Sequence, residues 1–502
     1  MRKERLLGRL PRRAAASVLV PALLATLSCA VGPDYRRPEA VAQMPERLEG
    51  AGVTWWRTEP ASAAAPKGPW WEVFGDPELS RLESEAASAN QDIRAAAARY
   101  AEARASADVA RSGLFPRLAA GASATRQQDS RNRPLSTTGE AAGKGFTFDK
   151  YTIPFDASYE VDLWGRVRRQ LQGARANEEA SAADWQGVRL SVEAEVAADY
   201  FTLRSLLAEK RALAASVEAY QKSLELTRNR REAGLSSDLD VAQAETLLNA
   251  ARAQQPALEE ARLRFVHALA VLVGQSAPLF HPNEEALAGD PPLIQPGLPS
   301  TLLERRPDVA AAERRMAAAN AAIGVAEAAF FPVLKLGGAA GFQSIESGTL
   351  LSAPSRFWAV GPSLALPLFE GGQRRAGVRS ARARYDETVA LYRQTVLRAF
   401  AEVEDNLAAQ RLLEQQYEQE KAAYLSASRQ LELAQNRYRG GLVSYLAVAT
   451  AQSAAQEHAR TVARLLGQRY LAAVALIKSL GGRWGEAEGL GKEDSPPGGQ
   501  QR

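Results

Sequence analysis

Residues 385–407, YDETVALYRQTVLRAFAEVEDNL, lie inside a run from Gly371 to Gly440 that decides the fold. Apolar side chains recur there at alternating steps of three and four, the spacing of a helix that packs along a continuous seam. No proline or glycine occurs between Val378 and Arg439. A helix of about 70 residues is about 105 Å long, so it must pack lengthwise against other helices, and residues 444–480 supply one. The seam residues are Tyr385, Val389, Tyr392, Val396, Phe400, Val403 and Leu407.

This long helix occurs twice, because the chain contains an internal repeat. The sequence NRREAGLSSDLDV at residues 229–241 is echoed by NRYRGGLVSYLAV at residues 436–448, an offset of 436 − 229 = 207. A second long helix is expected before the first copy, at about residues 166–233. Phe115-Pro116 matches Phe331-Pro332 with an offset of 332 − 116 = 216. The sequence therefore predicts an internal duplication of one unit that is helical and partly extended.

The composition is that of a folded chain. Its 502 residues are 46% hydrophobic and 24% charged, and the net charge of +4 is small for this length. Lysine and arginine are spread along the predicted helices, as on solvated faces, whereas nucleic-acid binding requires a clustered basic face. We therefore expect no nucleic-acid partner.

The N-terminus is typical of an export signal. A basic segment, residues 1–13, precedes a short apolar segment, residues 14–27, which is too short for an ordinary membrane span. Cys29, the only cysteine, follows directly, and this order is similar to bacterial lipoprotein signals, in which that cysteine is acylated. Thr26 stands where leucine is usual in such signals. We predict lipid attachment at Cys29, no other cofactor, and no internal disulfide.

In the segments that follow each Phe-Pro motif, the spacing of apolar residues changes from the helical period to a period of two. Apolar residues alternate with polar or small ones at residues 118–125 and 151–161, and again at residues 333–343 and 357–369. Each copy therefore reads as helix, strand, long loop, strand and long helix. Strands of ten to twelve residues match the length of transmembrane β-strands, although two ordinary hairpins on a soluble core are the alternative.

Four strands cannot close a membrane barrel, because the smallest known barrel needs about eight strands. Open sheet edges are not tolerated in hydrocarbon, so several chains must each contribute four strands. The expected fold is therefore mainly α with transmembrane β: an oligomeric β-barrel continued by a long α-helical barrel.

Several ordered motifs resemble those of the outer-membrane efflux lipoproteins of the TolC family, in its NodT-type branch. The resemblance runs from the signal to about Gly482 and is specific because the motifs are long and lie at separated places. The motif residues are Gly32-Pro33-Asp34-Tyr35, Trp70-Trp71 through Leu79, Asp162-Leu163-Trp164-Gly165, Leu302 through Glu313, Ala319 through Gly324, Phe330-Phe331-Pro332 and Tyr392 through Asp405.

The resemblance implies a homotrimer in the outer membrane of a Gram-negative bacterium, with a 12-stranded barrel and a helical tunnel that extends into the periplasm. Such proteins are passive exit ducts of tripartite efflux pumps that export small molecules such as drugs. Their partners are a periplasmic adaptor and an inner-membrane transporter, often of the resistance-nodulation-division type, together with outer-membrane lipid.

These patterns divide the chain as follows: signal peptide 1–28; extended arm 29–75; first repeat 76–274 with hairpin 116–163 and a tip near 234; connecting equatorial segment 275–300; second repeat 301–482 with hairpin 333–369 and a tip near 440; disordered tail 483–502. Within the first repeat, Asp76-Pro77 predicts the cap and first turn of a helix that runs to about Arg111. The Trp70-Trp71 pair is expected to pack in the core rather than bind a ligand.

No enzyme motif stands out. The sequence lacks a phosphate-binding glycine loop, a nucleophile elbow and a metal-spaced cluster, and its three histidines, His267, His281 and His458, are scattered. We therefore expect neither catalysis nor a metal site.

The candidate functional residues lie at the two turns between long helices. Glycine and leucine there form small turns on which an adaptor could dock, although turn geometry alone also explains the glycines. The predicted docking residues are Gly234, Leu235, Gly440, Gly441 and Leu442.

A tunnel-entrance gate is the second hypothesis. Tyr438 matches a family position that helps to hold the entrance closed. The acidic ring of some members is missing, because Ala447 and Thr450 stand where aspartate is frequent, but Asp238 and Asp240 remain in the first copy. The predicted gate residues are Asp238, Asp240, Arg437, Tyr438 and Arg439.

Two other classes fit part of the sequence. A periplasmic adaptor is also an exported lipoprotein with a long helical hairpin, but it has one hairpin between compact β domains. A surface coiled coil does not need the alternating strands. The duplicated long helices together with two strand pairs favour the duct.

Overall fold

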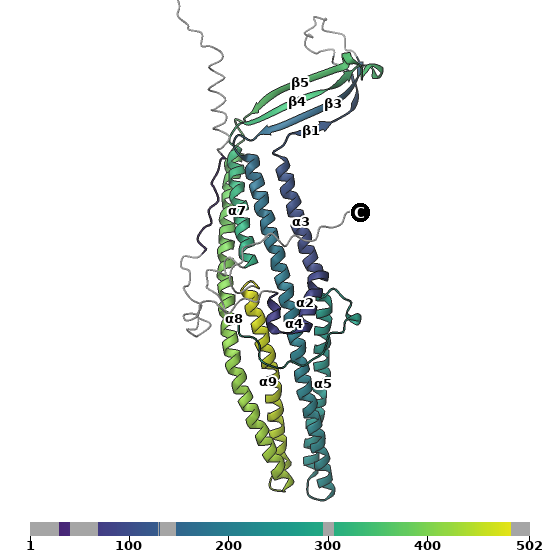
Figure 1. The fold of residues 1–502 in the computed structure, drawn as a ribbon, viewed down its shortest axis with the longest axis vertical. Coiled ribbons are helices and arrows are strands. Elements are labelled where there is room, and N and C mark those ends of the chain that lie inside the picture. Colours follow the sequence, from purple (N-terminus) through teal and green to yellow (C-terminus); the bar gives the residue numbers. More distant parts are fainter. Residues whose placement is uncertain (1–29, 41–68, 129, 131–146, 295–305, 483–502) are drawn as a thin grey trace, which may run out of the picture. The chain divides into compact units, whose positions relative to one another are not determined.

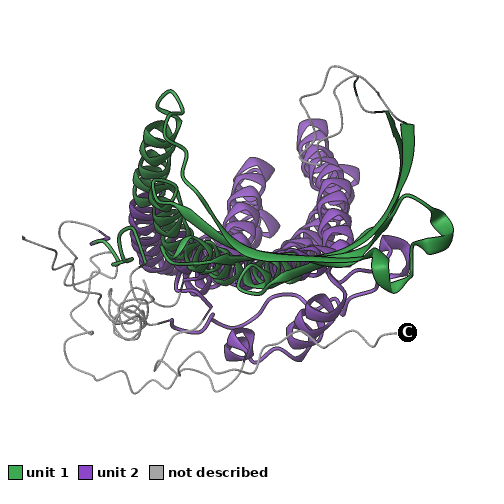
Figure 2. Cartoon of the chain, turned by 90° about the horizontal axis from the view of Figure 1, so that it is seen from above, with its two compact units in different colours: residues 1–38, 101–179, 313–390 green, residues 39–100, 180–312, 391–502 purple. Residues whose placement is uncertain are grey.

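The computed structural model describes residues 30–40, 69–128, 130, 147–294 and 306–482. The chain forms two compact units (Figure 2): unit 1 holds residues 1–38, 101–179 and 313–390, and unit 2 holds residues 39–100, 180–312 and 391–502. Each unit takes segments from both predicted repeats. The following predicted features lie outside the described residues: the signal peptide 1–28, Cys29, residues 41–68 of the arm, residues 131–146 of the first hairpin, residues 295–300 of the connecting segment, residues 301–305 of the second repeat, and the tail 483–502.

Four long helices dominate the chain (Figure 1). The helices α4 (Arg166–Glu232) and α8 (Gln373–Arg439) each have 67 residues, and each is followed after a short turn by a helix of 35 residues, α5 (Asp238–Leu272) or α9 (Tyr445–Ser479). The equal lengths follow from the duplicated sequence, and the predicted long helices are confirmed. None of the described helices combines the length and the apolar composition needed to cross a membrane.

The predicted helix from Pro77 to about Arg111 is two helices, α2 (Pro77–Ala89) and α3 (Gln91–Ser112). Asp76 caps α2 as expected, since its side chain accepts hydrogen bonds from two backbone N–H groups of the first turn. Asn90 causes the break, because its Oδ1 accepts from the N–H of Asp92 and Ile93 while its Nδ2 donates to the carbonyl of Leu272 at 2.9 Å. A buried tertiary contact thus ends one helix and begins the next.

The shorter helical elements are η2 (Trp70–Phe74), η3 (Ala277–Leu279), α7 (Pro307–Ala328), η4 (Ser347–Thr349) and η5 (Ala353–Ser355). Trp70 and Trp71 are buried in unit 2 with their rings 5.7 Å apart in an edge-to-face arrangement. Their predicted packing role is confirmed.

Unit 1 contains one antiparallel sheet in the order β1-β3-β4-β5, with β2 also paired to β3. Strands β3 (Thr147–Val161) and β4 (Val333–Ser344) come from different sequence repeats and form the longest pairing. The sheet bends into an arc when seen from above (Figure 2). The outer strands are β1 and β2 on one side and β5 on the other.

The first predicted strand is divided into β1 (Arg117–Ala120) and β2 (Ser123–Gln128). Both keep one register against β3, because Ala120 opposes Phe155 and Ser123 opposes Thr152. The gap faces Pro154, which has no N–H to donate, so one ladder bond is missing there. The sheet therefore has four strand positions, as predicted, although one of them is interrupted.

One face of the sheet is apolar, as the alternation predicted. Residues directly opposite each other in the register point to the same face. On this face, the register places apolar or small residues from β1, β3, β4 and β5: Leu118, Ala120, Phe155, Ala157, Tyr159, Leu336, Ala340, Trp358, Val360 and Leu364. Phe155, Trp358 and Val360 are exposed in the isolated chain.

Strand β5 (Arg356–Ala365) is shorter than predicted, because the expected strand continued to Phe369. Pro367 lies in the missing part and cannot donate a ladder hydrogen bond. The apolar residues Leu368 and Phe369 therefore lie outside the sheet and are 91% and 90% exposed.

Residues 30–38, the described part of the arm that belongs to unit 1, are held to that unit by hydrogen bonds. The N–H of Val31 donates to the Trp164 carbonyl at 3.0 Å, and Asn320 Nδ2 donates to the Pro33 carbonyl at 2.9 Å. Arg169, only 5% exposed, donates to the carbonyls of Val31 and Gly32 and pairs with Asp34 at 2.9 Å. Backbone and charged contacts thus hold this extended segment along α4 and α7.

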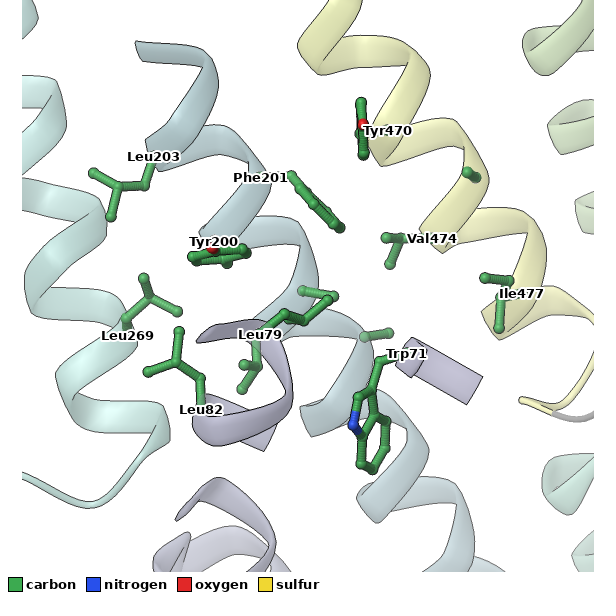
Figure 3. Close-up of a cluster of buried hydrophobic side chains, with 14 of the residues drawn as sticks. Trp71, Leu79, Leu82, Tyr200, Phe201, Leu203, Leu269, Tyr470, Val474 and Ile477 are labelled. Atoms are coloured by element: carbon green, nitrogen blue, oxygen red, sulfur yellow. The ribbon is translucent and has the colours of Figure 1, made fainter. Parts of the chain in front are cut away.

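The core of unit 2 is an apolar cluster where α2, α4, α5 and α9 meet (Figure 3). Phe201 lies at its centre, with its ring 4.7 Å from that of Tyr470 and 4.8 Å from that of Phe74. Full burial of such a side chain contributes about 1.5–3 kcal/mol. Phe280 and Leu287 of the connecting segment are buried in the same cluster, so this segment is part of the core.

Helices α4 and α9 approach closely at Gly467. A Cβ on Gly467 would lie closer than 3.0 Å to both Oγ and Cβ of Ser205. Gly467→Ala is therefore expected to destabilise unit 2 by about 1–3 kcal/mol, the usual penalty for overpacking. Thermal unfolding monitored by tryptophan fluorescence measures the effect. Ser205→Gly removes the obstructing atoms, so the double variant should be more stable than Gly467→Ala, and equal or lower stability would contradict this packing.

Candidate functional site

The two predicted turns have the same backbone structure. In the first, Leu235 N–H donates to the Arg230 carbonyl at 2.7 Å and Gly234 N–H to the Arg231 carbonyl at 2.9 Å. In the second, Leu442 N–H donates to the Arg437 carbonyl and Gly441 N–H to the Tyr438 carbonyl. This pattern is a Schellman motif, which requires a left-handed residue after the helix.

The left-handed positions are Gly234, with φ of 73°, and Gly441, with φ of 74°. Gly440 precedes Gly441 and has ordinary φ, so only one glycine of the Gly440-Gly441 pair is required by the turn. The sequence predicted both turns correctly. Their role in docking stays a prediction.

The leucines after these glycines are exposed. In many Schellman motifs this residue packs back on its own helix, but Leu235 is 67% and Leu442 is 77% exposed. Leu239 and Leu446, four residues further on, are 65% and 57% exposed. Each turn thus presents two leucines at matching positions of the repeat.

The helices that follow the turns begin differently. Ser237 and Asp240 form a capping box at the start of α5, with Ser237 N–H donating to Asp240 Oδ2 at 3.0 Å. Partial burial opposes ionisation of Asp240, but hydrogen bonds from Ser237 and Ser236 outweigh it and lower the pKa of this carboxyl. At the start of α9, Ser444 makes no side-chain cap hydrogen bond.

Tyr438 joins the two helix pairs within unit 2. It is 4% exposed, its hydroxyl lies 3.1 Å from Ser236 Oγ, and its ring lies edge-on to Tyr445 at 5.6 Å. The guanidinium of Arg230 lies over the Tyr438 ring at 4.8 Å, and its Nη1 donates to the Arg439 carbonyl at 3.2 Å. The second turn is therefore tied to the first in the same chain.

The structure does not bring the predicted gate charges together within the chain. Asp238 pairs with Arg231 at 2.5 Å, and Asp240 serves the capping box. Arg439 Nη1 donates to Asn436 Oδ1 at 3.2 Å. Among the described residues, no ion pair joins Arg437 or Arg439 to a carboxylate. Of the predicted gate set, two residues of the second turn contact the first turn in the described chain: Tyr438 through its side chain and Arg439 through its backbone carbonyl.

Arg230 and Ser236 contact Tyr438 but were not among the predicted site residues. Both lie at the first turn. A comparison of the two repeats pairs each of them with its equivalent residue in the second turn and not with Tyr438, so it does not reveal this contact. The cation-rich end of α4 was the only sequence signal that pointed to Arg230.

A second feature bears on function, namely the apolar face of the sheet. The same chain contains two pairs of helices, and in each pair a helix of 67 residues is joined to one of 35 residues by a turn with the same backbone structure. No group of three or more His, Cys, Asp or Glu side chains that could hold a metal ion occurs in the part of the chain described by the structure. These features define the class as outer-membrane channels built from strands and long helices.

The family follows from sequence. The outer membrane efflux protein family model matches residues 82–275 and 298–482, and the chain belongs to this family. The chain is 34% identical over 477 residues to a probable efflux pump outer membrane protein, TtgC, of Pseudomonas putida, with 93% of this chain and 95% of that protein covered.

Solved structures agree. The fold is similar to the outer-membrane channel OprN, with a TM-score of 0.82, 31% identity, and coverage of 90% of this chain and 99% of that one. The CmeC outer membrane channel of Campylobacter jejuni gives a TM-score of 0.83 at 26% identity, with 90% and 95% covered. The predicted family and the predicted fold class are both confirmed.

Proposed function

We propose that the protein is the outer-membrane exit duct of a tripartite efflux pump and carries small molecules outward without chemistry of its own. The observation that carries this proposal is the family match to both halves of the chain. Membership of the family places the protein in the outer membrane. Relatives named as efflux pump outer membrane proteins support the function.

We propose a homotrimer that completes the barrel. The sheet has four strand positions and two outer strands, β1/β2 and β5, whose backbone groups need partners in hydrocarbon. Three chains with four positions each supply twelve strands, within the known range of closed membrane barrels. The apolar face, with Phe155, Trp358 and Val360, would then face lipid.

The lipid anchor is proposed at Cys29, the residue before the described arm. The clamp formed by Arg169 on residues 31–34 supports it, because the clamp would fix the start of the mature chain to unit 1. Metabolic labelling with an alkyne palmitate, compared between the wild type and Cys29→Ser, tests it. Equal labelling of the two proteins would refute acylation at this residue.

The partners are proposed to be a periplasmic adaptor, which docks at Gly234-Leu235 and Gly440-Gly441-Leu442, and an inner-membrane transporter of the resistance-nodulation-division type. The exposed leucines of both turns support this docking. A photocrosslinking amino acid at Ser237 or at Val443, followed by mass spectrometry, tests it in cells. Capture of an adaptor with its transporter is expected, and capture of neither in an exported trimer would contradict the tripartite function.

We propose that Tyr438 helps to keep the tunnel entrance closed. Tyr438→Ala removes the contacts to Ser236, Arg230 and Tyr445, so the turns should separate more easily. We expect a severalfold higher conductance of the closed channel in planar bilayers. Tyr438→Phe keeps the ring contacts and serves as the control, with a much smaller increase. Unchanged conductance of Tyr438→Ala, or of variants that neutralise Asp238, Asp240, Arg437 and Arg439, would remove those residues from the gate.

A further inference from the structure

The two turns differ in charge although they share one backbone. The first copy, residues 229–241, carries Arg230, Arg231, Glu232, Asp238 and Asp240, a net charge of 2 − 3 = −1. The second copy, residues 436–448, carries only two arginines and has a net charge of +2. At the repeat offset of 207, every acid of the first turn is replaced. The replacements are Glu232 by Arg439, Asp238 by Tyr445 and Asp240 by Ala447.

Most charges of the first turn have a partner within the chain, and the exposed Glu232 is the exception among the described contacts. Arg231 pairs with Asp238 at 2.5 Å, Arg228 pairs with Glu245 at 2.6 Å, and the Arg230 guanidinium lies on the Tyr438 ring. Asp240 accepts the hydrogen bonds of the capping box. The charge that this turn leaves for a partner is therefore the single acid Glu232 and not a positive charge.

The second turn keeps its positive charge. Arg437 and Arg439 are exposed, and within the described chain neither forms an ion pair with a carboxylate. Residues 433–456 contain no aspartate or glutamate. The start of α9 adds a partial positive charge, which the structure leaves uncompensated because the first turn of α9 has no acid.

This arrangement does not serve stability. The Asp240 position of the capping box is Ala447 in the second copy, and Ser444 has no side-chain cap bond. Loss of such a cap destabilises a helix start, and positions that break a local rule without compensation are often functional. Arginines in the last turn of α8 do favour its C-terminus, but the first copy has two arginines there as well, so they do not explain the missing acids.

Apolar surface lies beside the positive charge. Leu442, in the turn after Arg437 and Arg439, is 77% exposed, and Leu446, in the first turn of α9, is 57% exposed. We propose that this surface, defined by Arg437, Arg439, Leu442 and Leu446, binds the tip of an adaptor helical hairpin that carries an apolar side chain flanked by carboxylates. The inference rests on the proposed docking function and specifies the chemistry of the partner. The second turn would then select the adaptor by charge, whereas the first turn would contribute mainly apolar contact.

The test uses the full-length trimer in detergent and two synthetic disulfide-closed helical hairpins. In one hairpin the turn carries a leucine between two glutamates, and in the other a leucine between two arginines. We expect the acidic hairpin to bind about five- to tenfold more tightly at 50 mM salt, because two exposed charge pairs are each weak. This preference should shrink at 300 mM salt, where charges are screened.

Arg437→Glu/Arg439→Glu should reverse the preference. The matched control is Lys421→Glu/Arg429→Glu. It makes the same change in charge at exposed positions closer to the N-terminus of α8 and should keep the wild-type preference. Equal binding of the two hairpins to the wild type, preference for the basic hairpin, no binding of either at 1 mM, or an unchanged preference in Arg437→Glu/Arg439→Glu would each overturn the inference.

Channel conductance of the same variants separates this inference from the proposed function. If the variants conduct but the hairpin preference does not respond, the exit duct stands and the charge selection fails. If Arg437→Glu/Arg439→Glu raises the closed-channel conductance without changing the preference, the arginines act in the gate, as the sequence hypothesis held, and not in docking.

Discussion

Gly341→Ala is expected to remove most of the assembled protein from the outer membrane. Gly341 lies in β4 opposite Pro154 of β3, and a Cβ there would lie closer than 3.0 Å to the Ile153 carbonyl oxygen. The Cβ position is fixed by the backbone of β4, and the oxygen belongs to the backbone of β3, with which β4 is paired. No side-chain rotation can therefore relieve the contact. The penalty should therefore reach or exceed the upper end of the usual overpacking range, about 3 kcal/mol.

Gly337→Ala is the matched control in the same strand. The nearest atom to a Cβ on Gly337 is the Gly361 carbonyl oxygen at 3.9 Å, an ordinary contact. Outer-membrane fractions are compared by gel mobility with and without heating, which distinguishes assembled trimer from unfolded chain. The wild type and Gly337→Ala should give similar amounts of the heat-modifiable form. A wild-type amount of assembled Gly341→Ala would show that the β3–β4 pairing tolerates a side chain there.

The long helices were predictable because their determinants are local. In α8 the apolar seam at Val389, Tyr392 and Val396 has the helical period, and the absence of proline and glycine between Val378 and Arg439 leaves no place for a break. The turns were predictable for the same reason, since Gly234 and Gly441 supply the left-handed residue that ends each helix. The alternating strands also required only a period of two.

The deviations arise from contacts between distant segments. Asn90 divides α2 from α3 because it bonds the carbonyl of Leu272, a residue 182 positions away. Pro154 interrupts the strand opposite it, not its own strand, so only the register reveals the gap. The contact of Arg230 and Ser236 with Tyr438 joins two helix pairs that are separated by about 200 residues, and a repeat comparison cannot show it.

Replacement of Glu83 is the second change for which we expect a large effect on stability. Glu83 is a buried acid that has no hydrogen-bond partner among the described residues. Its side chain lies in α2 within unit 2, its exposed fraction is 0%, and neither carboxyl oxygen has a hydrogen-bond partner among the described residues. Burial and then the charge of Glu193 raise the pKa of Glu83 from 4.5 to about 10. Glu193 itself is held by Trp70 Nε1 at 3.0 Å and by Arg189 at 2.8 Å.

The direction of the pH effect follows from this raised pKa. Below pH 4.5 Glu83 is protonated in both the folded and the unfolded chain, so it carries no penalty there. Between pH 4.5 and about 10 only the unfolded chain loses the proton, so folding becomes less favourable as pH rises. At pH 7 the penalty is about 3 kcal/mol, from 2.5 pH units at about 1.36 kcal/mol each.

Glu83→Gln is therefore expected to stabilise the protein at neutral and alkaline pH. Glutamine resembles the protonated acid in shape and is neutral, so the two proteins should unfold at similar temperatures at pH 5. Above pH 6.5 the variant should unfold at a higher temperature, by roughly 3–6 °C at pH 8 for a chain of this size. Tryptophan fluorescence at a fixed scan rate measures this, because unfolding of such an assembly is expected to be irreversible.

Between pH 6.5 and 9 the pH dependence of unfolding distinguishes Glu83 from Asp199, a half-buried acid whose pKa is also raised. Burial and then the charge of Glu195 raise the pKa of Asp199 only to about 6, so its contribution changes between about pH 3.8 and 6 and is constant above. Glu102→Gln, the same chemical change at an exposed position of α3, should leave the pH dependence unaltered. If Glu83→Gln follows the wild-type curve across this range, the Glu83 carboxyl must already be ionised in the folded protein, with a hydrated or cationic partner that the apolar core of unit 2 would have to accommodate.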